Sequence, residues 1–406
     1  MSLLFQQEKL SSRATPVEQS MESLQKARIA IVHYWFVSRR GGERVVEVIA
    51  DMFPGADLFS LVVDPKKLSP ALQARSIRTS FLQRLPGSTR WHRHLLPLYP
   101  MALEQFDLRG YDLVLSSESG PAKGVITDAQ TCHVCYCHSP MRYLWDFYHD
   151  YKNGRSFGAF SRPVFTLASH YLRLWDVASA SRVDHFLANS TNVAARIRKH
   201  YRRDATVIHA PVNVQNGYLA DRTEDYYLIV GQFVDYKRID LAIATCNHLG
   251  RPLHIVGEGE QYKKLRKLAG PTIVFYGSLS DQDLREQYAH CRALLFPGEE
   301  DFGIVPVEAL SFGRPVIAFD RGGAKETIRG FYPDRVASVE SCTGVLFREQ
   351  SPESLREAIQ TFEKVEDRFY PFYIRQQAER FDVSHFRTKL GNFLSEKLEH
   401  FKARCP

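Results

Sequence analysis

The chain has 406 residues, of which 44% are hydrophobic and 24% are charged. This length predicts two domains, and the composition is typical of a globular enzyme and excludes a wholly disordered chain. No apolar run is long enough to span a bilayer. Residues 1–26 have no apolar centre of a secretory signal, so we expect a disordered lead-in there and a cytoplasmic protein. Seven scattered cysteines favour reduced thiols over a disulfide framework.

The first predicted unit is a strand over Lys26–His33, a loop with Gly41 and Gly42, and a helix ending at Phe53. The two glycines either let the backbone approach a ligand or merely form the entry to the helix. Strands and helices continue to alternate along the chain, which predicts parallel sheets with helices on both faces. The further strands are expected over residues 58–63, 113–116, 133–136, 185–188, 206–209, 227–230, 253–256, 273–276, 293–296 and 316–319.

The net charge of +7 is concentrated between Ala71 and Gly110, where six arginines face two acids. Aromatic residues are interleaved with these cations, as around Arg84, Arg90, Trp91 and Arg93. This combination suits an anionic lipid surface, and the competing interpretation is a solvated helix face that covers its own domain. Nothing else in the chain supports binding of nucleic acid.

The stretch Thr131–Pro140 contains three cysteines and two histidines, which raises the question of zinc. Alternation along a strand sends Cys135 and Cys137 to one face and His138 to the other, so we interpret the cysteines as small core residues and expect no metal site. Asp281 and Asp283 resemble a metal-binding pair but are expected to cap a helix. His138 ends its strand, where it is either a contact to a sugar hydroxyl or a structural histidine.

The pattern breaks between Ala210 and Glu224, which divides the chain into predicted domains over residues 27–212 and 213–382, with a returning helix over 383–406. After the first strand of the second domain, Lys237 and Arg238 are placed to neutralise a diphosphate, or are surface cations of the next helix. Glu258 follows another strand and either borders a nucleobase or belongs to a plain turn.

The richest stretch of the chain is Gly298–Glu308. It links a buried strand to a short helix, so the amides of Gly303–Val305 would face an anion. Glu300 and Glu308 frame the turn, and carboxylates beside a phosphate suit hydroxyl groups of a ribose and a hexose. The pattern predicts a nucleotide-sugar site; the alternative is a solvated acidic loop before an ordinary helix.

These residues resemble the retaining glycosyltransferases of family 4. The resemblance covers roughly Lys26 to Phe386 and rests on Glu300 and Glu308 with Phe302-Gly303 between them. It is closest to the mannosyltransferases of bacterial O-antigen and exopolysaccharide assembly, through four further motifs. These are Gly41-Gly-Glu-Arg44, Cys135 to Asp146, Ala188-Asn-Ser190 and Tyr236-Lys-Arg238.

The resemblance implies a GT-B fold, with two facing Rossmann-like domains of doubly wound parallel sheet and a C-terminal crossover helix. It implies that Glu308 binds the ribose, Glu300 the donor-sugar hydroxyls and Lys237 the diphosphate, and that His138 contacts the sugar near its reacting carbon. Many members carry Arg where this chain has Gln232. The expected catalytic residues are His138, Glu300 and Lys237, and the donor-binding residues are Gly42, Gln232, Lys237, Arg238, Glu258, Phe302, Gly303, Ile304, Val305 and Glu308.

The implied activity is metal-independent transfer of a hexose, mannose from GDP-mannose, to a polyprenyl-diphosphate-linked saccharide with retention. No cofactor is expected beyond the nucleotide sugar. Arg84, Arg90, Trp91 and Arg93 would face the acceptor and the inner face of the cytoplasmic membrane. The alternatives are a UDP-sugar donor, a nucleotide-sugar epimerase on the same fold, and a catalytically silent binding subunit, which Gln232 keeps open.

Overall fold

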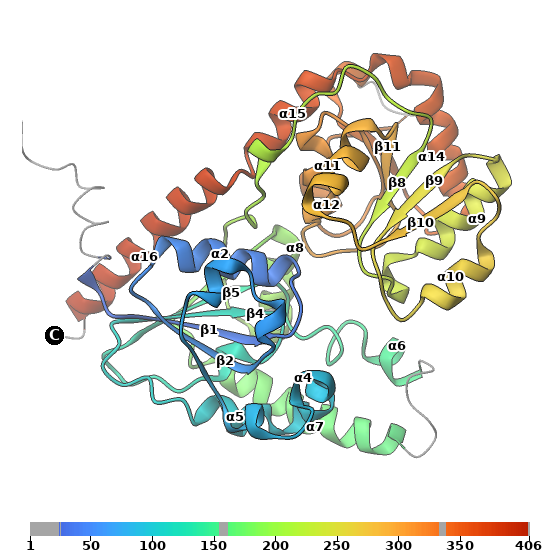
Figure 1. Ribbon diagram of the computed structural model, residues 1–406. Coiled ribbons are helices and arrows are strands. Elements are labelled where there is room, and N and C mark those ends of the chain that lie inside the picture. The colour runs from blue at the N-terminus through green and yellow to red at the C-terminus, as the bar shows by residue number, and fades with distance from the viewer. Residues whose placement is uncertain (1–23, 25, 154–160, 333–337, 405–406) are drawn as a thin grey trace, which may run out of the picture. The chain divides into compact units, whose positions relative to one another are not determined.

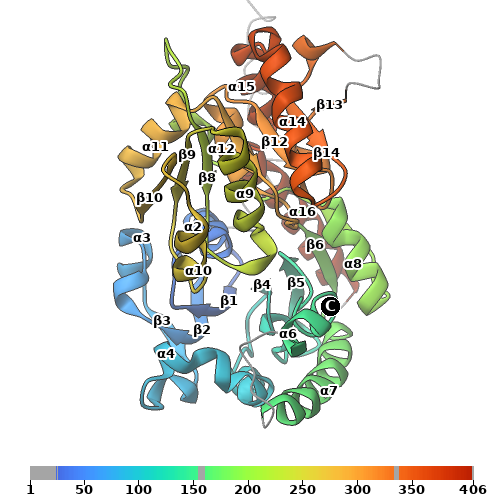
Figure 2. The same cartoon turned by 90° about the vertical axis from the view of Figure 1, so that its right-hand side faces the viewer.

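The computed structural model describes residues 24, 26–153, 161–332 and 338–404. The expected lead-in over residues 1–26 therefore lies almost entirely outside the described residues. The chain forms two compact units. Unit 1 contains the described residues up to Ala188, then Ala194–Ile208 and Arg387 onwards; unit 2 contains Asn189–Val193 and His209–Phe386. Each unit is built on a seven-stranded sheet with helices on both faces (Figures 1 and 2).

The sheet of unit 1 is parallel throughout, in the order β3-β2-β1-β4-β5-β6-β7. Its strands are β1 (Ile29–Phe36), β2 (Asp57–Val63), β3 (Ile77–Thr79), β4 (Leu113–Glu118), β5 (Cys132–Cys137), β6 (His185–Ala188) and β7 (Ala205–Val207). Its helices are α2 (Gly41–Met52), α3 (Pro70–Gln73), α4 (Ser88–Trp91), α5 (Tyr99–Glu104), α6 (Tyr148–Asn153), α7 (Ser161–Ala180) and α8 (Thr191–Tyr201), with 3-10 turns η1 (Pro65–Lys67), η2 (Phe81–Arg84), η3 (His92–Leu98) and η4 (Ala122–Gly124).

The sheet of unit 2 is also parallel, in the order β10-β9-β8-β11-β12-β14-β13. Its strands are β8 (Tyr227–Val230), β9 (Leu253–Val256), β10 (Ile273–Gly277), β11 (Ala293–Phe296), β12 (Val316–Phe319), β13 (Gly330–Phe331) and β14 (Gly344–Phe347). Its helices are α9 (Ile239–Leu249), α10 (Tyr262–Leu268), α11 (Asp281–His290), α12 (Ile304–Ser311), α13 (Ala324–Thr327), α14 (Pro352–Val365) and α15 (Pro371–Glu379), with 3-10 turns η5 (Val214–Asn216), η6 (Asp235–Lys237), η7 (Val339–Ser341) and η8 (Glu366–Arg368).

The central strands are buried on both faces, which is why they read as nearly continuous apolar runs in the sequence. β11 and β12 are buried at every position. The helices are amphipathic: α2, for example, buries Val45, Val46 and Ile49 at helical spacing. Right-handed crossovers between parallel strands then require the helices to cover both faces of each sheet.

The alternation predicted from the sequence is confirmed, and each predicted strand has a counterpart within a few residues. The largest shift is in β1, predicted over Lys26–His33 and observed over Ile29–Phe36. Three short strands were not predicted: β3, β13 and β14. All three lie at or next to a sheet edge; β3 and β13 are too short to show an apolar pattern, whereas β14 is buried at every position.

The last helix, α16 (Val383–Arg404), belongs to both units, as the crossover in the predicted fold requires. From Arg387 onwards it is part of unit 1, where Arg387 pairs with Asp51 at 3.7 Å and Lys402 pairs with Asp112 at 2.6 Å. Across the residues that the structure describes, no helix combines the length and the hydropathy of a membrane span.

Candidate active site in two halves

Each sheet has one position where the strand order reverses, and ligands of doubly wound folds bind outside the carboxyl ends of the strands at that position. In unit 1 this is the β1/β4 pair and in unit 2 the β8/β11 pair. The predicted donor residues Gln232, Lys237 and Glu300 follow β8 and β11, whereas Gly42 and His138 follow β1 and β5. Each unit therefore carries its own set of candidate site residues.

The half in unit 2 contains an ion pair between Lys237 and Glu300. The Lys237 Nζ lies 2.7 Å from the Glu300 Oε1, and both side chains are about four-fifths buried, with 15% and 21% of their surface exposed. The ammonium group also lies against Gly231, where a Cβ would come within 2.7 Å of it. A side chain at position 231 would therefore displace the lysine, so the loop after β8 determines where this positive charge is held.

The N-terminus of α12 adds a second source of positive potential. Gly303 precedes the helix with φ of +87°, a conformation that glycine adopts without strain. Helix α12 starts at Ile304, two residues before Pro306. The first amides of any α-helix have no partner within the helix. The amides of Gly303, Ile304 and Val305 are thus available to an anion, as the sequence suggested.

Glu308 lies on the second turn of α12 and is held by a neighbour on α11. Its Oε2 accepts a hydrogen bond of 2.8 Å from the hydroxyl of Tyr288, whose side chain is buried. This contact orients the carboxylate, whose oxygens are hydrogen-bond acceptors. The arrangement suits a vicinal diol such as that of a ribose.

The neighbouring loops pack directly onto these residues. The Gly323 amide donates to the Glu300 carbonyl at 2.8 Å, which brings the Arg321-Gly-Gly loop after β12 onto the Glu300 turn. The Phe233 amide donates to the Glu258 carbonyl at 2.9 Å, so the loop after β9 lies beside Gln232. The Glu258 side chain is exposed. The Arg238 Nε lies 3.3 Å from the Asp240 Oδ1.

The half in unit 1 is centred on His138. Its Nε2 forms a hydrogen bond of 2.9 Å with the Ser117 hydroxyl at the end of β4, and its amide donates to the Glu118 carbonyl at 2.6 Å. Gly42, at the start of α2, lies close by: a Cβ there would be 3.7 Å from the same ring nitrogen and 3.4 Å from the Tyr34 hydroxyl. Gly42 and His138, separated by 96 positions in the sequence, are thus brought together.

Burial shifts the pKa values of the ionisable groups of this half in the direction that favours their neutral forms. Burial lowers the pKa of His138 to about 4, and burial together with the nearby His138 lowers the pKa of His33 to about 3. Burial raises the pKa of Glu43, which accepts hydrogen bonds from the Ser38 hydroxyl at 3.1 Å and the Arg40 amide at 3.2 Å. Near pH 7 both imidazoles are therefore uncharged.

The cysteines of β5 are core residues, as predicted. Cys132, Cys135 and Cys137 are free thiols and fully buried, and burial raises their pKa values. His133 bonds the Ser116 hydroxyl at 2.8 Å and lies 3.3 Å from the Arg182 carbonyl, so both ring nitrogens have protein partners. Within residues 26–153, 161–332 and 338–404, no His, Cys, Asp and Glu side chains are grouped as metal ligands would be.

Two further predictions concern the surface. Ser280 caps α11 by accepting from the Asp283 amide at 3.1 Å, which confirms the capping interpretation of Asp281 and Asp283. Arg84, Arg90, Trp91 and Arg93 all have exposed side chains on η2, α4 and η3. The Arg90 guanidinium lies 5.3 Å from the centre of the Trp91 ring.

Four residues that contact the candidate site were not expected from the sequence: Tyr34, Glu43, Ser117 and Tyr288. Ser117 had a detectable signal, because Leu113–Ser116 was predicted as a strand and polar residues follow it at the edge where ligands bind. Tyr288 had none, since a tyrosine on the inner side of a helix is usually an ordinary core residue.

The fold and the two half-sites define a GT-B glycosyltransferase, and comparison with known proteins agrees. Residues 39–216 match the profile described as Glycosyltransferase Family 4, and residues 214–378 match the profile described as Glycosyl transferases group 1. The two profiles adjoin and together span most of the chain. The protein therefore belongs to the family 4 glycosyltransferases with the GT-B fold.

Among curated proteins, the chain is 25% identical over 250 residues to an O-antigen chain mannosyltransferase of Salmonella typhimurium, covering 58% of this chain and 67% of that protein. It is 37% identical over 100 residues to a GDP-mannose-dependent alpha-mannosyltransferase of Mycobacterium tuberculosis, covering 24% and 26%. An uncharacterized glycosyltransferase of Methanocaldococcus jannaschii is 25% identical over 181 residues, covering 43% and 48%. The chain thus spans about half the length of that relative.

Solved structures share the fold at lower identity. A sucrose-phosphate synthase of Thermosynechococcus elongatus superimposes with a TM-score of 0.63 at 18% identity, covering 91% of this chain and 99% of that one. The HepE protein of Anabaena, solved with UDP and glucose, gives a TM-score of 0.65 at 16% identity, covering 91% and 99%.

Proposed function

We propose that this glycosyltransferase transfers mannose from GDP-mannose to a polyprenyl-diphosphate-linked saccharide, with retention of configuration at the transferred carbon. The observation that carries the proposal is the arrangement in unit 2. There Lys237, Glu300 and the N-terminus of α12 lie at the carboxyl edge of the sheet, with Glu308 one turn further along the helix. Relatives described as O-antigen and GDP-mannose-dependent mannosyltransferases support the choice of sugar and base.

In this proposal the diphosphate of the donor binds between the Lys237 ammonium and the amides of Gly303, Ile304 and Val305. Negative charge develops on the leaving phosphate as the bond between the sugar and the phosphate breaks, and fixed positive groups stabilise it without a metal ion. In the structure, the carboxylate of Glu300 pairs with the ammonium group of Lys237. A bound diphosphate then competes for that ammonium, which frees Glu300 to accept hydrogen bonds from the sugar hydroxyls.

The proposed reaction takes place on one face of the sugar ring. The bond between the sugar C1 and the β-phosphate oxygen breaks, a bond from C1 to the acceptor hydroxyl forms on the same face of the ring, and the hydroxyl proton passes to the departing phosphate. No enzyme carboxylate forms a covalent bond in this scheme. His138, uncharged near pH 7, contributes a neutral hydrogen bond to the donor sugar.

On the acceptor side, we assign Arg84, Arg90, Trp91 and Arg93 to peripheral contact with an anionic bilayer and the lipid-linked acceptor. Their side chains are exposed, and no acid occurs in the sequence between Asp64 and Glu104. Cations of this kind attract anionic headgroups, whereas Trp is favoured at the boundary between headgroups and acyl chains.

The test is a thermal-shift panel of GDP, UDP, ADP and dTDP with their hexose conjugates, because a ligand that binds the native state raises its melting temperature. A selective shift with GDP and GDP-mannose is expected. A selective response to UDP would replace the donor and keep the reaction class. Product formed from the nucleotide sugar without acceptor would indicate an epimerase, and no response to any nucleotide would favour a binding subunit.

A further inference from the structure

Helix α7 of unit 1 carries an exposed apolar surface along one side. Val164, Leu167 and Leu174 are 69%, 73% and 62% exposed, more than any other large apolar residue that the structure describes. Tyr171, between them, is 50% exposed. These four positions recur at intervals of three and four residues, so they form one stripe along the helix.

The opposite side of α7 is packed into unit 1, so the helix is anchored, and its stripe is exposed among the residues that the structure describes. Leu172, Trp175 and Asp176 are buried. The Trp175 Nε1 donates to Glu104 at 2.9 Å, which ties α7 to α5, and Asp176 accepts from the Trp145 Nε1 at 2.8 Å and pairs with Lys123. The stripe is therefore a surface of a well-packed helix.

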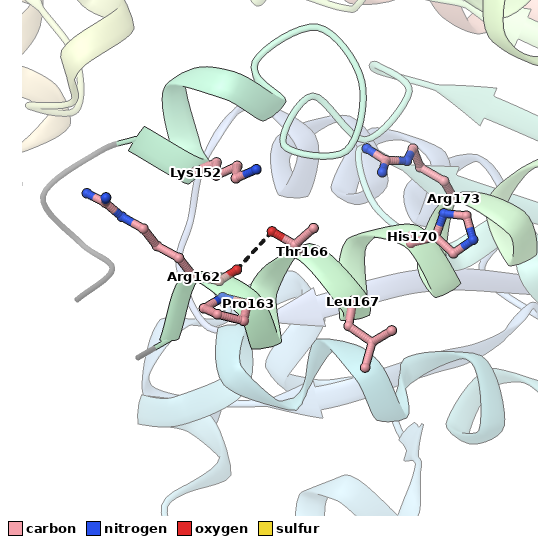
Figure 3. Close-up of a pocket in the computed structure, with 7 residues that line it drawn as sticks. All are labelled: Lys152, Arg162, Pro163, Thr166, Leu167, His170 and Arg173. Carbon is pink, nitrogen blue, oxygen red and sulfur yellow. Dashed lines mark hydrogen bonds between the residues drawn. The ribbon is translucent and has the colours of Figure 1, made fainter. Parts of the chain in front are cut away.

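Basic groups flank the stripe. A shallow pocket of about 620 Å³ is lined by Lys152, Arg162, Pro163, Thr166, Leu167, His170 and Arg173. No lining residue is acidic, and the one acid of α7, Asp176, is fully buried. Figure 3 shows Lys152 and Arg162 extending on the α6 side of the helix, while Leu167 points away from both.

The same end of unit 1 carries further exposed apolar and basic residues. In Figure 1, helices α4, α5 and α7 lie along the same edge of unit 1. Trp91 on α4 and Met101 on α5 are 52% and 49% exposed. An apolar stripe with cations beside it on α6 and α7 matches an anionic bilayer in polarity and in charge, because apolar side chains enter the headgroup boundary while cations stay with the phosphates.

We propose that α7 is a membrane-docking helix, whose stripe of Val164, Leu167, Tyr171 and Leu174 enters the surface of an anionic phospholipid bilayer. Lys152 and Arg162 face the lipid phosphates beside it. This proposal rests on the proposed function in one respect: a lipid-linked acceptor is the reason why the enzyme must reach a membrane. It is independent of the donor chemistry in unit 2.

The experiment measures co-sedimentation of the full chain with vesicles of phosphatidylcholine alone or mixed with phosphatidylglycerol. The wild type is expected to bind the mixed vesicles more strongly. The double variant Leu167→Glu/Leu174→Glu is expected to lose at least about tenfold in affinity for both vesicles, because it places charges in the apolar boundary. The matched control is Tyr370→Glu/Phe372→Glu on the surface of unit 2, where both side chains are 58% exposed, and it should bind like the wild type.

The charge contribution has its own pair of variants. Lys152→Gln/Arg162→Gln should weaken binding to the mixed vesicles by about fivefold for each cation and leave binding to phosphatidylcholine unchanged. The control Lys263→Gln/Lys267→Gln, on exposed positions of α10, removes the same charge from unit 2 and should have no effect.

Several outcomes overturn the proposal. It fails if the wild type binds neither vesicle, if the stripe variant binds like the wild type, or if light scattering shows a dimer that the stripe variant converts to monomer without any vesicle binding. Thermal shifts with GDP are recorded on the same samples. A GDP response without vesicle binding rejects the docking helix alone, whereas vesicle binding without any nucleotide response rejects the proposed donor alone.

Discussion

The two halves of the candidate site occupy equivalent positions in similar sheets but differ in their electrostatics. In unit 2, a lysine and a glutamate form a partly exposed ion pair beside a helix N-terminus. In unit 1, His33, His138 and Tyr34 are buried, and burial keeps both imidazoles neutral near pH 7. In the proposed function, unit 2 compensates the charge of the diphosphate and unit 1 offers neutral hydrogen bonds to an uncharged group.

Replacing Lys237 with Met should have the largest effect, because it removes the positive charge of the unit 2 half and leaves the carboxylate of Glu300 in place. We expect a loss of about 10²- to 10³-fold in the rate of transfer from GDP-mannose, with weaker binding of GDP in calorimetry. Lys264→Met, which removes an exposed lysine paired with Asp235, is the control. Equal activity of the two variants would show that the ion pair is only structural.

Glu308→Gln should weaken nucleotide binding by about tenfold, since a hydrogen bond to a charged acceptor contributes about 1.5 to 3 kcal/mol. Tyr288→Phe removes the phenol that orients this carboxylate and is expected to cause a smaller loss. Calorimetry with GDP measures both affinities. If GDP binds Glu308→Gln as tightly as the wild type, then Glu308 does not contact the ribose.

The burial of His138 in unit 1 predicts that the stability of the fold depends on pH. The folded pKa of about 4 for His138 lies below its ordinary value, so the unfolded chain binds the additional proton as the pH falls below about 6.5. The contribution of His138 to the free energy of unfolding is therefore fully present above about pH 6.5 and is lost on acidification. At pH 5 the loss from this residue is about 2 kcal/mol.

His138→Asn should flatten this dependence between pH 6.5 and 5, which denaturant unfolding at several pH values will measure. Comparison of each variant with itself across pH removes the constant effect of the substitution. Glu118, whose pKa burial raises to about 7, acts in the opposite direction in both proteins and cancels in the difference. Parallel pH profiles for the two proteins would mean that His138 is not held neutral by the fold.

Of these substitutions, Gln232→Arg should have the smallest effect on the affinity for GDP, and it should raise that affinity. Many family members have a cation at this position, and Gln232 is partly buried in the loop after β8 beside Gly231. An added guanidinium is expected to raise the affinity for GDP about threefold, by roughly the contribution of one partly exposed charge pair. Calorimetry with GDP at low and moderate salt provides the measurement. Unchanged or weaker binding would show that Lys237 and the α12 amides already satisfy the diphosphate.

The sequence alone determined the class of fold and the location of the unit 2 half. Gly298–Glu308 is a contiguous stretch between a buried strand and a helix, so local rules placed its amides and carboxylates at one sheet edge. The alternation of apolar strands with amphipathic helices likewise predicted two parallel sheets, because the spacing of apolar residues within each element indicates which of its faces is buried.

Only the tertiary structure decided which distant residues meet. The ion pair of Lys237 with Glu300, the bond of Tyr288 to Glu308 and the approach of Gly42 and Ser117 to His138 join residues 20 to 96 positions apart. The exposure of Val164, Leu167 and Leu174 was equally hidden. A helical period shows that a residue is apolar and which neighbours share its face, but whether that face is covered depends on elements elsewhere in the chain.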